Sequence, residues 1–175
     1  SQKSYVLRAV SSYLLSFAHC VAYLSATQLK ELRLPTKVPK VEIRTFLPRR
    51  AVCGSATGRP VTRGVNDPLV LVHAGRLSVE KGSFLFVELC RELTRQGVSI
   101  RAEMVGPCQP ETRDALVAAI AASKPPPHIR IRDHLEELEL MEVISSAHVL
   151  VHLSSVDSFP LIVLEAVAAG AFPIC

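Results

Sequence analysis

The chain has 175 residues, enough for about one domain, and carries 20 Lys and Arg against 16 Asp and Glu, a net charge of +4 with His neutral. This weak positive charge, with aromatic residues at only 5% and no Trp, argues against a nucleic-acid-binding protein, which would need a denser basic surface or more rings for stacking. Hydrophobic residues at 49% and charged residues at 21% are ordinary for a globular protein and exclude a disordered chain.

The first 47 residues predict a small block of helices and strands. A helix is expected first, then an apolar strand at Cys20–Leu24, a short helix after Ser25 and a strand near Val41–Phe46. The apolar stretch from Tyr5 to Ala26 contains Arg8 and several polar residues, so we favour buried elements over a signal peptide or a membrane segment.

Residues 48–68 have the composition of a linker. They combine several prolines and glycines with four arginines. We interpret this basic run as a solvated connector between two blocks, with a contribution to anion binding as the alternative.

Residues 69–175 alternate short apolar runs with helical patterns. Strands are expected at 69–74, 100–105, 128–132, 148–153 and 172–175, and helices at 81–96, 110–122, 133–146 and 160–169. This alternation predicts an α/β fold with a doubly wound, Rossmann-like parallel sheet covered on both faces. Because the last strand ends without a turn or polar tail, we expect the chain to be a piece of a longer protein.

The expected strand order locates the functional crevice. In a doubly wound sheet of order 3-2-1-4-5, the first and fourth strands are neighbours, and ligands bind beyond their carboxyl ends. The segments after Ala74 and after Leu153 are therefore expected to face one crevice.

The segment after Ala74 contains a glycine and two cations. Gly75 permits a sharp turn, and Arg76 and Lys81 bracket the loop before the next helix. A lysine opposes the dipole at a helix N-terminus unless an anion lies there, so the pattern is typical of a phosphate site. The alternative is a solvent-facing turn with no ligand.

The segment after Leu153 contains the only two formal charges between residues 149 and 175, Asp157 and Glu165. Glu165 lies among apolar helical residues and needs a partner or a ligand. A vicinal diol, such as a ribose, suits its two carboxylate oxygens. Pro160 opens the helix, whose unpaired N–H groups can accept a phosphate. The alternative is a Glu165 paired with an arginine and an Asp157 that only favours the helix dipole.

Other patterns argue against competing chemistries. His148 and His152 are four residues apart, but they belong to a strand pattern with no suitable third ligand, so no metal site is predicted. The five cysteines are widely spaced and odd in number, which indicates reduced thiols in a cytosolic setting. The motifs of dinucleotide-binding proteins, P-loop proteins and serine hydrolases are absent from the sequence.

Three motifs together resemble one family: AGRLSVEKG at 74–82, MVGPCQPE at 104–111 and SSVDSFPLIVLEAVAAGAFPI at 154–174. They are similar to the donor-binding half of the retaining, two-domain GT-B fold glycosyltransferases, the group-one glycosyl transferases. The resemblance implies that 1–47 is the end of the N-terminal, acceptor-side domain and 48–68 the interdomain linker. It also implies that 69–175 is the nucleotide-sugar-binding domain, truncated at its C-terminus.

The resemblance also implies roles for individual residues. The family's arginine and lysine hold the diphosphate of the donor, which maps onto Arg76 and Lys81 after Gly75. The family's two acids are separated by seven residues and map onto Asp157 and Glu165. The resemblance implies that Asp157 lies near the donor sugar and that Glu165 binds the ribose. It also implies that Asp157 is catalytic, together with Arg76 and Lys81. Backbone contacts to the donor are expected at Ser158, Phe159 and Leu161.

The sequence departs from the family pattern at three places. Asp157 replaces the more common Glu, which puts donor preference and activity in doubt. The G-x-P element after the acidic motif is one residue longer, at Gly170–Pro173, and the usual F-x-G turn before His134 is missing.

The implied function is sugar transfer from a nucleotide diphosphate sugar to an acceptor hydroxyl with retention of configuration, by a fragment that is inactive alone. No cofactor or metal is expected, because the side chains of Arg76 and Lys81 would bind the diphosphate in place of a metal ion. The resemblance implies a carbohydrate, lipid or protein acceptor bound through the missing half, no nucleic acid partner, and a location in the cytoplasm or at the cytosolic face of a membrane, with peripheral membrane contact. A catalytically inactive binding or scaffold domain and a nucleotide-sugar epimerase are the alternatives.

Overall fold

The computed structural model describes residues 10, 13–23, 37–43, 64, 67–157 and 160–175. The chain divides into two compact units, Ser1–Phe46 and Leu47–Cys175. Within the described ranges, none of the helices has the length and apolar character needed to cross a membrane.

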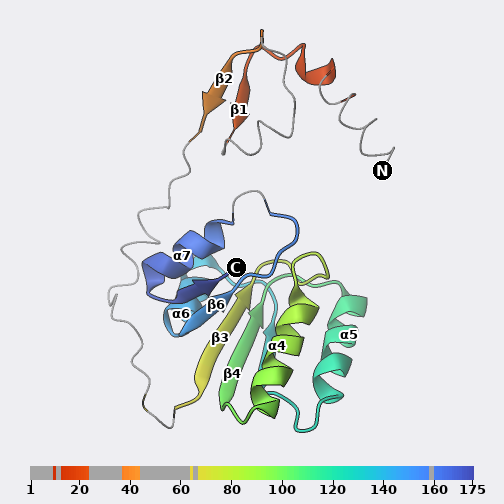
Figure 1. The fold of residues 1–175 in the computed structure, drawn as a ribbon, viewed down its shortest axis with the longest axis vertical. Helices are drawn as coiled ribbons and strands as arrows, with labels where there is room; N and C mark the ends of the chain where they lie inside the picture. Colours follow the sequence, from red (N-terminus) through yellow and green to blue (C-terminus); the bar gives the residue numbers. More distant parts are fainter. Residues whose placement is uncertain (1–9, 11–12, 24–36, 44–63, 65–66, 158–159) are drawn as a thin grey trace. The chain divides into compact units, whose positions relative to one another are not determined.

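The N-terminal unit contains a pair of parallel strands. Strand β1, Val21–Tyr23, lies within the strand expected at Cys20–Leu24 and pairs with β2, Lys40–Glu42 (Figure 1). Strand β2 begins one residue before the strand expected near Val41 and ends at Glu42. The helix expected after Ser25 and most of the expected linker lie outside the described residues.

The C-terminal unit is built on a five-stranded parallel sheet of order β5-β4-β3-β6-β7. Its strands are β3 (Leu69–Ala74), β4 (Ile100–Val105), β5 (Ile129–Arg132), β6 (Val149–Val151) and β7 (Phe172–Ile174). Its helices are α4 (Ser83–Arg95), α5 (Pro110–Ala121), α6 (Glu137–Ser145) and α7 (Leu161–Ala169). Counted from β3, this is the order 3-2-1-4-5, so the predicted Rossmann-like fold and the position of the switch point between β3 and β6 are confirmed.

The central strand β3 is apolar on both faces because helices cover both. Val70 and Val72 pack in a core with residues of α6 and α7, including Ile144 and Ala166. Leu71 packs in a second core with Phe86 of α4 and with residues of α5. Figure 1 shows the resulting three layers, with α4 and α5 on one side of the sheet and α6 and α7 on the other.

Three expected boundaries differ from the structure at the carboxyl edge of the sheet. Helix α6 begins at Glu137, four residues later than the helix expected from Asp133, and the Asp133 carboxylate accepts a hydrogen bond from Arg113 of α5 at 2.5 Å. Helix α4 begins at Ser83 because Gly82 before it adopts a left-handed conformation, with φ of 76°. Strand β6 ends at Val151, which leaves His152 in the loop that follows.

Candidate functional site

A pocket of about 290 Å³ lies beyond the carboxyl ends of β3 and β6, at the switch point of the sheet. The loop after β3, the loop after β6, helix α6 and the start of α7 all contribute to its wall. Its lining includes Gly75, Arg76 and Lys81, then His152 and Asp157, and finally Leu140 and Leu161. The two segments that the sequence singled out therefore meet at one pocket.

Lys81 and Asp157 join the two loops directly. The Nζ atom of Lys81 lies 2.6 Å from Oδ2 of Asp157 and also donates a hydrogen bond to the carbonyl oxygen of Val156 at 3.1 Å. The side chains of Lys81 and Asp157 are 31% and 25% exposed, so water and a ligand can still reach the pair. A charged ligand could therefore draw this lysine away without unfolding either loop.

The main chains of the two loops are also in contact. Ser155 donates two hydrogen bonds to the carbonyl oxygen of Glu80, one from its amide at 2.9 Å and one from its hydroxyl at 3.1 Å. A Cβ atom on Gly82 would lie 2.3 Å from the carbonyl oxygen of Leu153. Only glycine fits there, since its left-handed φ of 76° and this close approach both exclude a side chain.

The third motif, at residues 104–111, supports the loop after β3 from its other side. The amide of Gly75 donates a hydrogen bond to the carbonyl oxygen of Val105 at 2.9 Å. The amide of Leu77 donates one to the carbonyl oxygen of Pro107 at 3.0 Å. A Cβ atom on Gly106 would lie 2.0 Å from the carbonyl oxygen of Gly75, whereas the space around Gly75 itself is open. The loop is thus held by its neighbours while Gly75 faces the pocket.

A buried histidine of β3 holds the loop after β3 in place through hydrogen bonds. His73 hydrogen-bonds through Nδ1 to the carbonyl of Val151 at 3.0 Å and through Nε2 to the hydroxyl of Ser83 at 3.1 Å. Since a carbonyl only accepts, Nδ1 carries the proton and Nε2 accepts from the hydroxyl. The Ser83 oxygen then accepts the amide of Ser78 at 3.0 Å. Burial lowers the pKa of His73, which favours this neutral form.

Glu165 lies on α7 and is partly buried. Burial raises the pKa of its carboxyl group, and the negative charge of Glu137 on α6 raises it further. Within the described part of the chain it forms no salt bridge or hydrogen bond, so the arginine partner considered from the sequence is not found there. Glu165 is not among the residues that line the pocket, although Leu161, one turn earlier on α7, is. Ser158 and Phe159 lie outside the described residues.

Sequence reasoning missed several residues of the pocket. His152 was considered only as a metal ligand, yet it lines the pocket beside Asp157. The rule that identified Gly75 also applies to it, because both follow the carboxyl end of a parallel strand. Leu140 comes from α6, and no local pattern in the sequence indicates that it reaches the crevice. Within the described ranges, no group of three or more His, Cys, Asp and Glu side chains could hold a metal ion.

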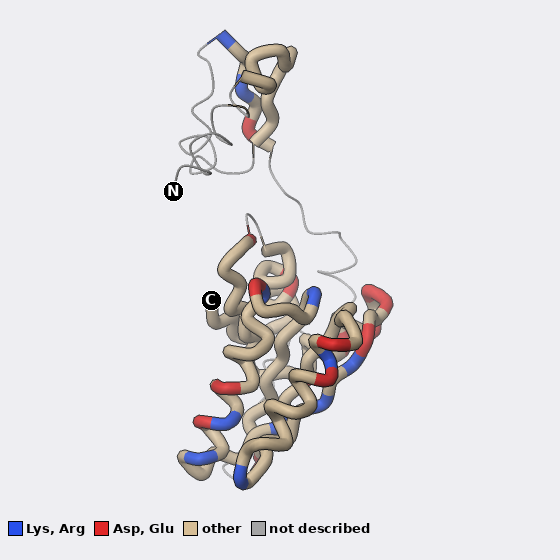
Figure 2. The backbone as a smooth tube through the Cα atoms, turned by 90° about the vertical axis from the view of Figure 1, so that its right-hand side faces the viewer, with Lys and Arg blue, Asp and Glu red and all other residues tan. Residues whose placement is uncertain are grey.

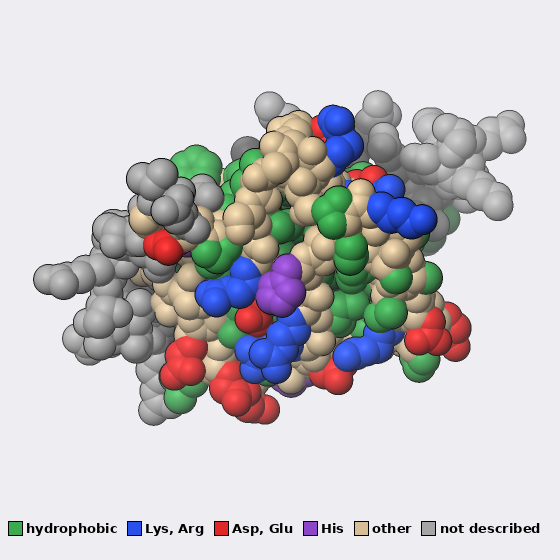
Figure 3. Space-filling view, turned by 90° about the horizontal axis from the view of Figure 1, so that it is seen from below, with side chains coloured by type: hydrophobic (Ala, Val, Ile, Leu, Met, Phe, Trp, Pro, Cys, Tyr) green, Lys and Arg blue, Asp and Glu red, His purple; other side chains and the backbone are tan. Residues whose placement is uncertain are grey.

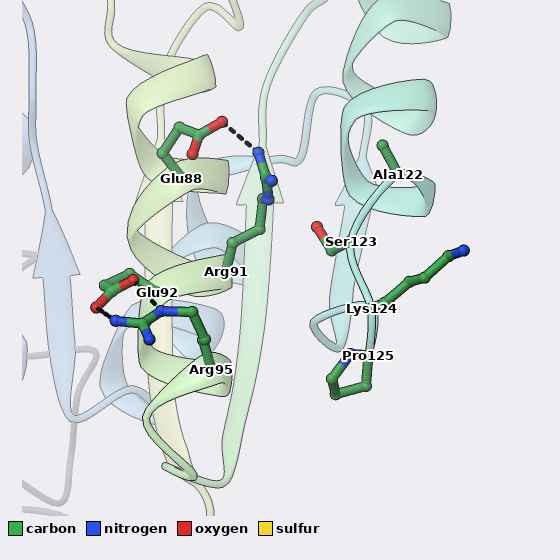
Figure 4. Close-up of a pocket in the computed structure, with 8 residues that line it drawn as sticks. All are labelled: Glu88, Arg91, Glu92, Arg95, Ala122, Ser123, Lys124 and Pro125. Carbon is green, nitrogen blue, oxygen red and sulfur yellow. Dashed lines mark hydrogen bonds and ion pairs between the residues drawn. The ribbon is translucent and has the colours of Figure 1, made fainter.

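A second pocket, of about 180 Å³, lies between α4 and the segment after α5 (Figure 4). Its charges are paired within one helix: Arg91 with Glu88 at 2.6 Å and Arg95 with Glu92 at 2.7 Å. None of the residues singled out from the sequence lines it.

The surface charge of the C-terminal unit is mixed. Figure 2 shows both basic and acidic segments along its backbone, and Figure 3 shows both kinds of side chain on the face seen from below. The pocket beyond β3 and β6 therefore differs from the rest of this surface in its position at the switch point and in its salt bridge between Lys81 and Asp157, which are distant in the chain. It does not differ in net charge.

The comparisons with known proteins identify the family and the fold. The model of the family described as glycosyl transferases group 1 matches residues 57–175, which include all three motifs. No curated protein matches the chain.

Three solved structures with the same fold are distant in sequence. A mutant of TarM from S. aureus, solved with Fondaparinux, alpha-GlcNAc-glycerol and UDP, has 12% identity and a TM-score of 0.69, with 91% of this chain and 30% of that chain covered. Anabaena Alr3699/HepE, solved with UDP and glucose, has 16% identity and a TM-score of 0.68, with 97% and 47% covered. A UDP-forming trehalose-phosphate synthase from Burkholderia xenovorans has 14% identity and a TM-score of 0.69, with 92% and 46% covered. The chain thus spans less than half the length of these proteins.

Proposed function

Because the chain belongs to the glycosyl transferases group 1 family, we propose that it forms the donor-binding part of a retaining glycosyltransferase. In this proposal the full enzyme moves a sugar from a nucleotide diphosphate sugar to an acceptor hydroxyl. The observation that carries it is the convergence of Arg76, Lys81 and Asp157 on one pocket at the switch point of the sheet.

The diphosphate is assigned to the cations of the pocket. Arg76 is exposed at the rim and Lys81 is partly exposed, so both can reach a phosphate oxygen. The start of α7, which also lines the pocket, adds the partial positive charge of a helix N-terminus. Together these groups would stabilise the negative charge that develops on the departing diphosphate, which takes the bonding electrons when its bond to the sugar breaks. The same cations leave no need for a metal in this proposal.

The two acids are assigned to the sugars of the donor. Asp157 lies in the pocket and would face the transferred sugar. Glu165, one turn beyond Leu161 on α7, would accept hydrogen bonds from the ribose diol. Its raised pKa fits this role, because a carboxylate that burial penalises gains from two hydroxyl donors.

UDP is the first nucleotide to test, since the TarM and HepE structures were solved with it. We assign the acceptor, a carbohydrate, lipid or protein hydroxyl, to the rest of the enzyme, and residues 1–47 to the end of its acceptor-side domain. A cytoplasmic enzyme, or one at the cytosolic face of a membrane, accords with this donor chemistry.

One observation favours a second candidate function, a binding or scaffold domain without turnover. The short side chain of Asp157 is held by Lys81 at 2.6 Å, which engages the acid that would face the sugar. Hydrolysis of the sugar donor by the full-length enzyme separates the two functions, because only an active site releases UDP and free sugar.

Calorimetric titration of the chain with UDP, GDP and ADP tests the proposal. We expect one diphosphate to bind, and Arg76→Ala to weaken it about tenfold to a hundredfold, since a charge-assisted hydrogen bond contributes about 1.5–3 kcal/mol. Arg91→Ala is the matched control, because Arg91 is paired with Glu88 far from the switch point and its loss should leave affinity unchanged. Equal affinity in wild type and Arg76→Ala would exclude the phosphate role.

A further inference from the structure

His152 occupies a position in the pocket that the proposed function leaves without a role. It follows β6, and its amide donates to the carbonyl of Ile174 at 2.8 Å, which fixes the backbone of the residue beside β7. Its side chain is only 10% exposed and lines the pocket with Arg76, Lys81 and Asp157. The imidazole is therefore buried from bulk solvent but open to the crevice.

The imidazole approaches the acid that Lys81 already holds. Nε2 of His152 lies 3.4 Å from Oδ2 of Asp157, the same oxygen that Nζ of Lys81 contacts at 2.6 Å. Nε2 is buried and has no hydrogen-bond partner of good geometry in the described part of the chain. In the tautomer with a proton on Nε2, this nitrogen is a buried donor beside an acceptor that Lys81 contacts at a shorter distance, and it can donate to that oxygen when Lys81 leaves.

The neighbouring histidines cannot serve in its place. Both nitrogens of His73 are engaged, with Val151 and Ser83. His148 also has a buried Nε2 without a partner among the described residues, but its Nδ1 accepts the amide of Val70 at 3.0 Å and it does not line the pocket. Among the three histidines, only His152 lies beside both Asp157 and the pocket.

We propose that His152 is a positioning residue. When a nucleotide diphosphate binds Lys81, His152 forms a hydrogen bond with Asp157 in place of Lys81. This inference rests on the proposed function, in which Lys81 moves to the phosphates. Lys81 then gives up its contact with Oδ2, and the Nε2–H group of His152 moves the short distance needed to donate to the same oxygen. Asp157 keeps its place in both states, and its Oδ2 atom exchanges the contact with Lys81 for one with His152.

Calorimetric titration of the chain with UDP tests this exchange. His152→Leu removes the donor, and we expect it to weaken UDP binding about threefold to tenfold, the range for one hydrogen bond. His152→Gln retains an N–H group at a comparable distance from the backbone and should restore most of the affinity. In an Asp157→Ala background, which removes the acceptor oxygens, His152→Leu should have no further effect. His148→Leu is the matched control for general destabilisation and should leave affinity unchanged.

The outcomes separate this inference from the function on which it rests. If Lys81→Met weakens UDP binding while His152→Leu does not, the exchange is wrong and the phosphate role of Lys81 stands. Effects of His152→Leu that are equal in the wild-type and Asp157→Ala backgrounds would also overturn the exchange, because His152 would then act independently of Asp157. If Lys81→Met binds UDP as well as wild type does, the proposed function fails and the exchange fails with it.

Discussion

The two charged pockets of the C-terminal unit are built in opposite ways. In the pocket between α4 and the segment after α5, each arginine is paired with a glutamate three residues away on the same helix. In the pocket beyond β3 and β6, Lys81 is paired with Asp157, which is 76 positions away in the chain. The first arrangement needs only a helix, whereas the second needs the whole sheet to bring two loops together.

This difference bears on what each pocket can bind. Pairs at spacing i, i+3 on a solvated helix are satisfied by their own geometry and stabilise it only weakly. A pair between two loops at a switch point can exchange partners with a ligand, because the sheet, the loop contacts and His73 hold the loops in place. We therefore expect substitutions around the switch point to affect both folding and binding, and those between α4 and α5 to affect neither strongly.

The largest expected effect is a loss of stability at the switch point, and a comparison of two glycines tests it. Gly82 and Gly97 both have a positive φ, but a Cβ atom would meet the backbone of Leu153 only at Gly82. Gly82→Ala should destabilise the protein by about 2–5 kcal/mol, from strain and overpacking together. Gly97→Ala, at the end of α4, should lose only the strain, about 1–2 kcal/mol. Thermal unfolding followed by circular dichroism measures both, and equal losses would contradict the close packing of the two loops.

Glu165→Gln should separate stability from binding. Since burial and Glu137 raise the pKa of the Glu165 carboxyl, its ionisation is less favourable in the folded state, and stability is lost as pH rises through that raised pKa. At pH 7.5 the glutamine variant should therefore unfold at an equal or higher temperature than wild type. If Glu165 binds the ribose, the same variant should bind UDP about tenfold to a hundredfold more weakly by calorimetry. A lower unfolding temperature with unchanged affinity would assign Glu165 a purely structural role.

His73 should make stability depend on pH near neutrality. Its pKa is lowered from 6.5 by burial, so below about pH 6.5 the unfolded chain takes up a proton that the folded protein does not. Stability is full above that pH and falls as pH decreases toward the lowered pKa. Unfolding temperatures compared at pH 7.5 and 5.5 should show the decrease, and His73→Gln should reduce it. An identical decrease in the variant would assign the effect to other groups.

The smallest effect is expected between α4 and α5. Arg95→Met removes a solvated pair with Glu92 and should change the unfolding temperature by no more than about 1 °C. It should also leave UDP affinity as in wild type, whereas Lys81→Met should weaken it. A loss of affinity in Arg95→Met would mean that the nucleotide binds at the other pocket.

The sheet could be predicted from the sequence because its signals are local. The apolar run at Leu69–Ala74 and the helical spacing between Ser83 and Arg95 predicted their elements to within two residues. The strand order then brought Arg76, Lys81 and Asp157 to one edge by a general rule for such sheets.

The details of the site could not be predicted because they depend on contacts between distant segments. The salt bridge between Lys81 and Asp157, and the position of His152 beside it, follow from the packing of two loops at Gly82. Glu165 lies on the same face of α7 as Leu161 but one turn farther along the helix, and the sequence does not specify how far along α7 the pocket extends. The helix start expected at Asp133 was wrong because of another contact between distant segments, in which Arg113 of α5 binds the Asp133 carboxylate.

The contact between Gly82 and Leu153 also limits how this domain can be recombined. Because Leu153 leaves no room for a side chain at Gly82, the packing of the two segments depends on both of them, although they are distant in the chain. A chimera that imports the acidic loop of a homologue to change donor choice would have to import the glycine-containing loop with it. Engineering of sugar preference in this domain therefore begins with two segments exchanged as a pair.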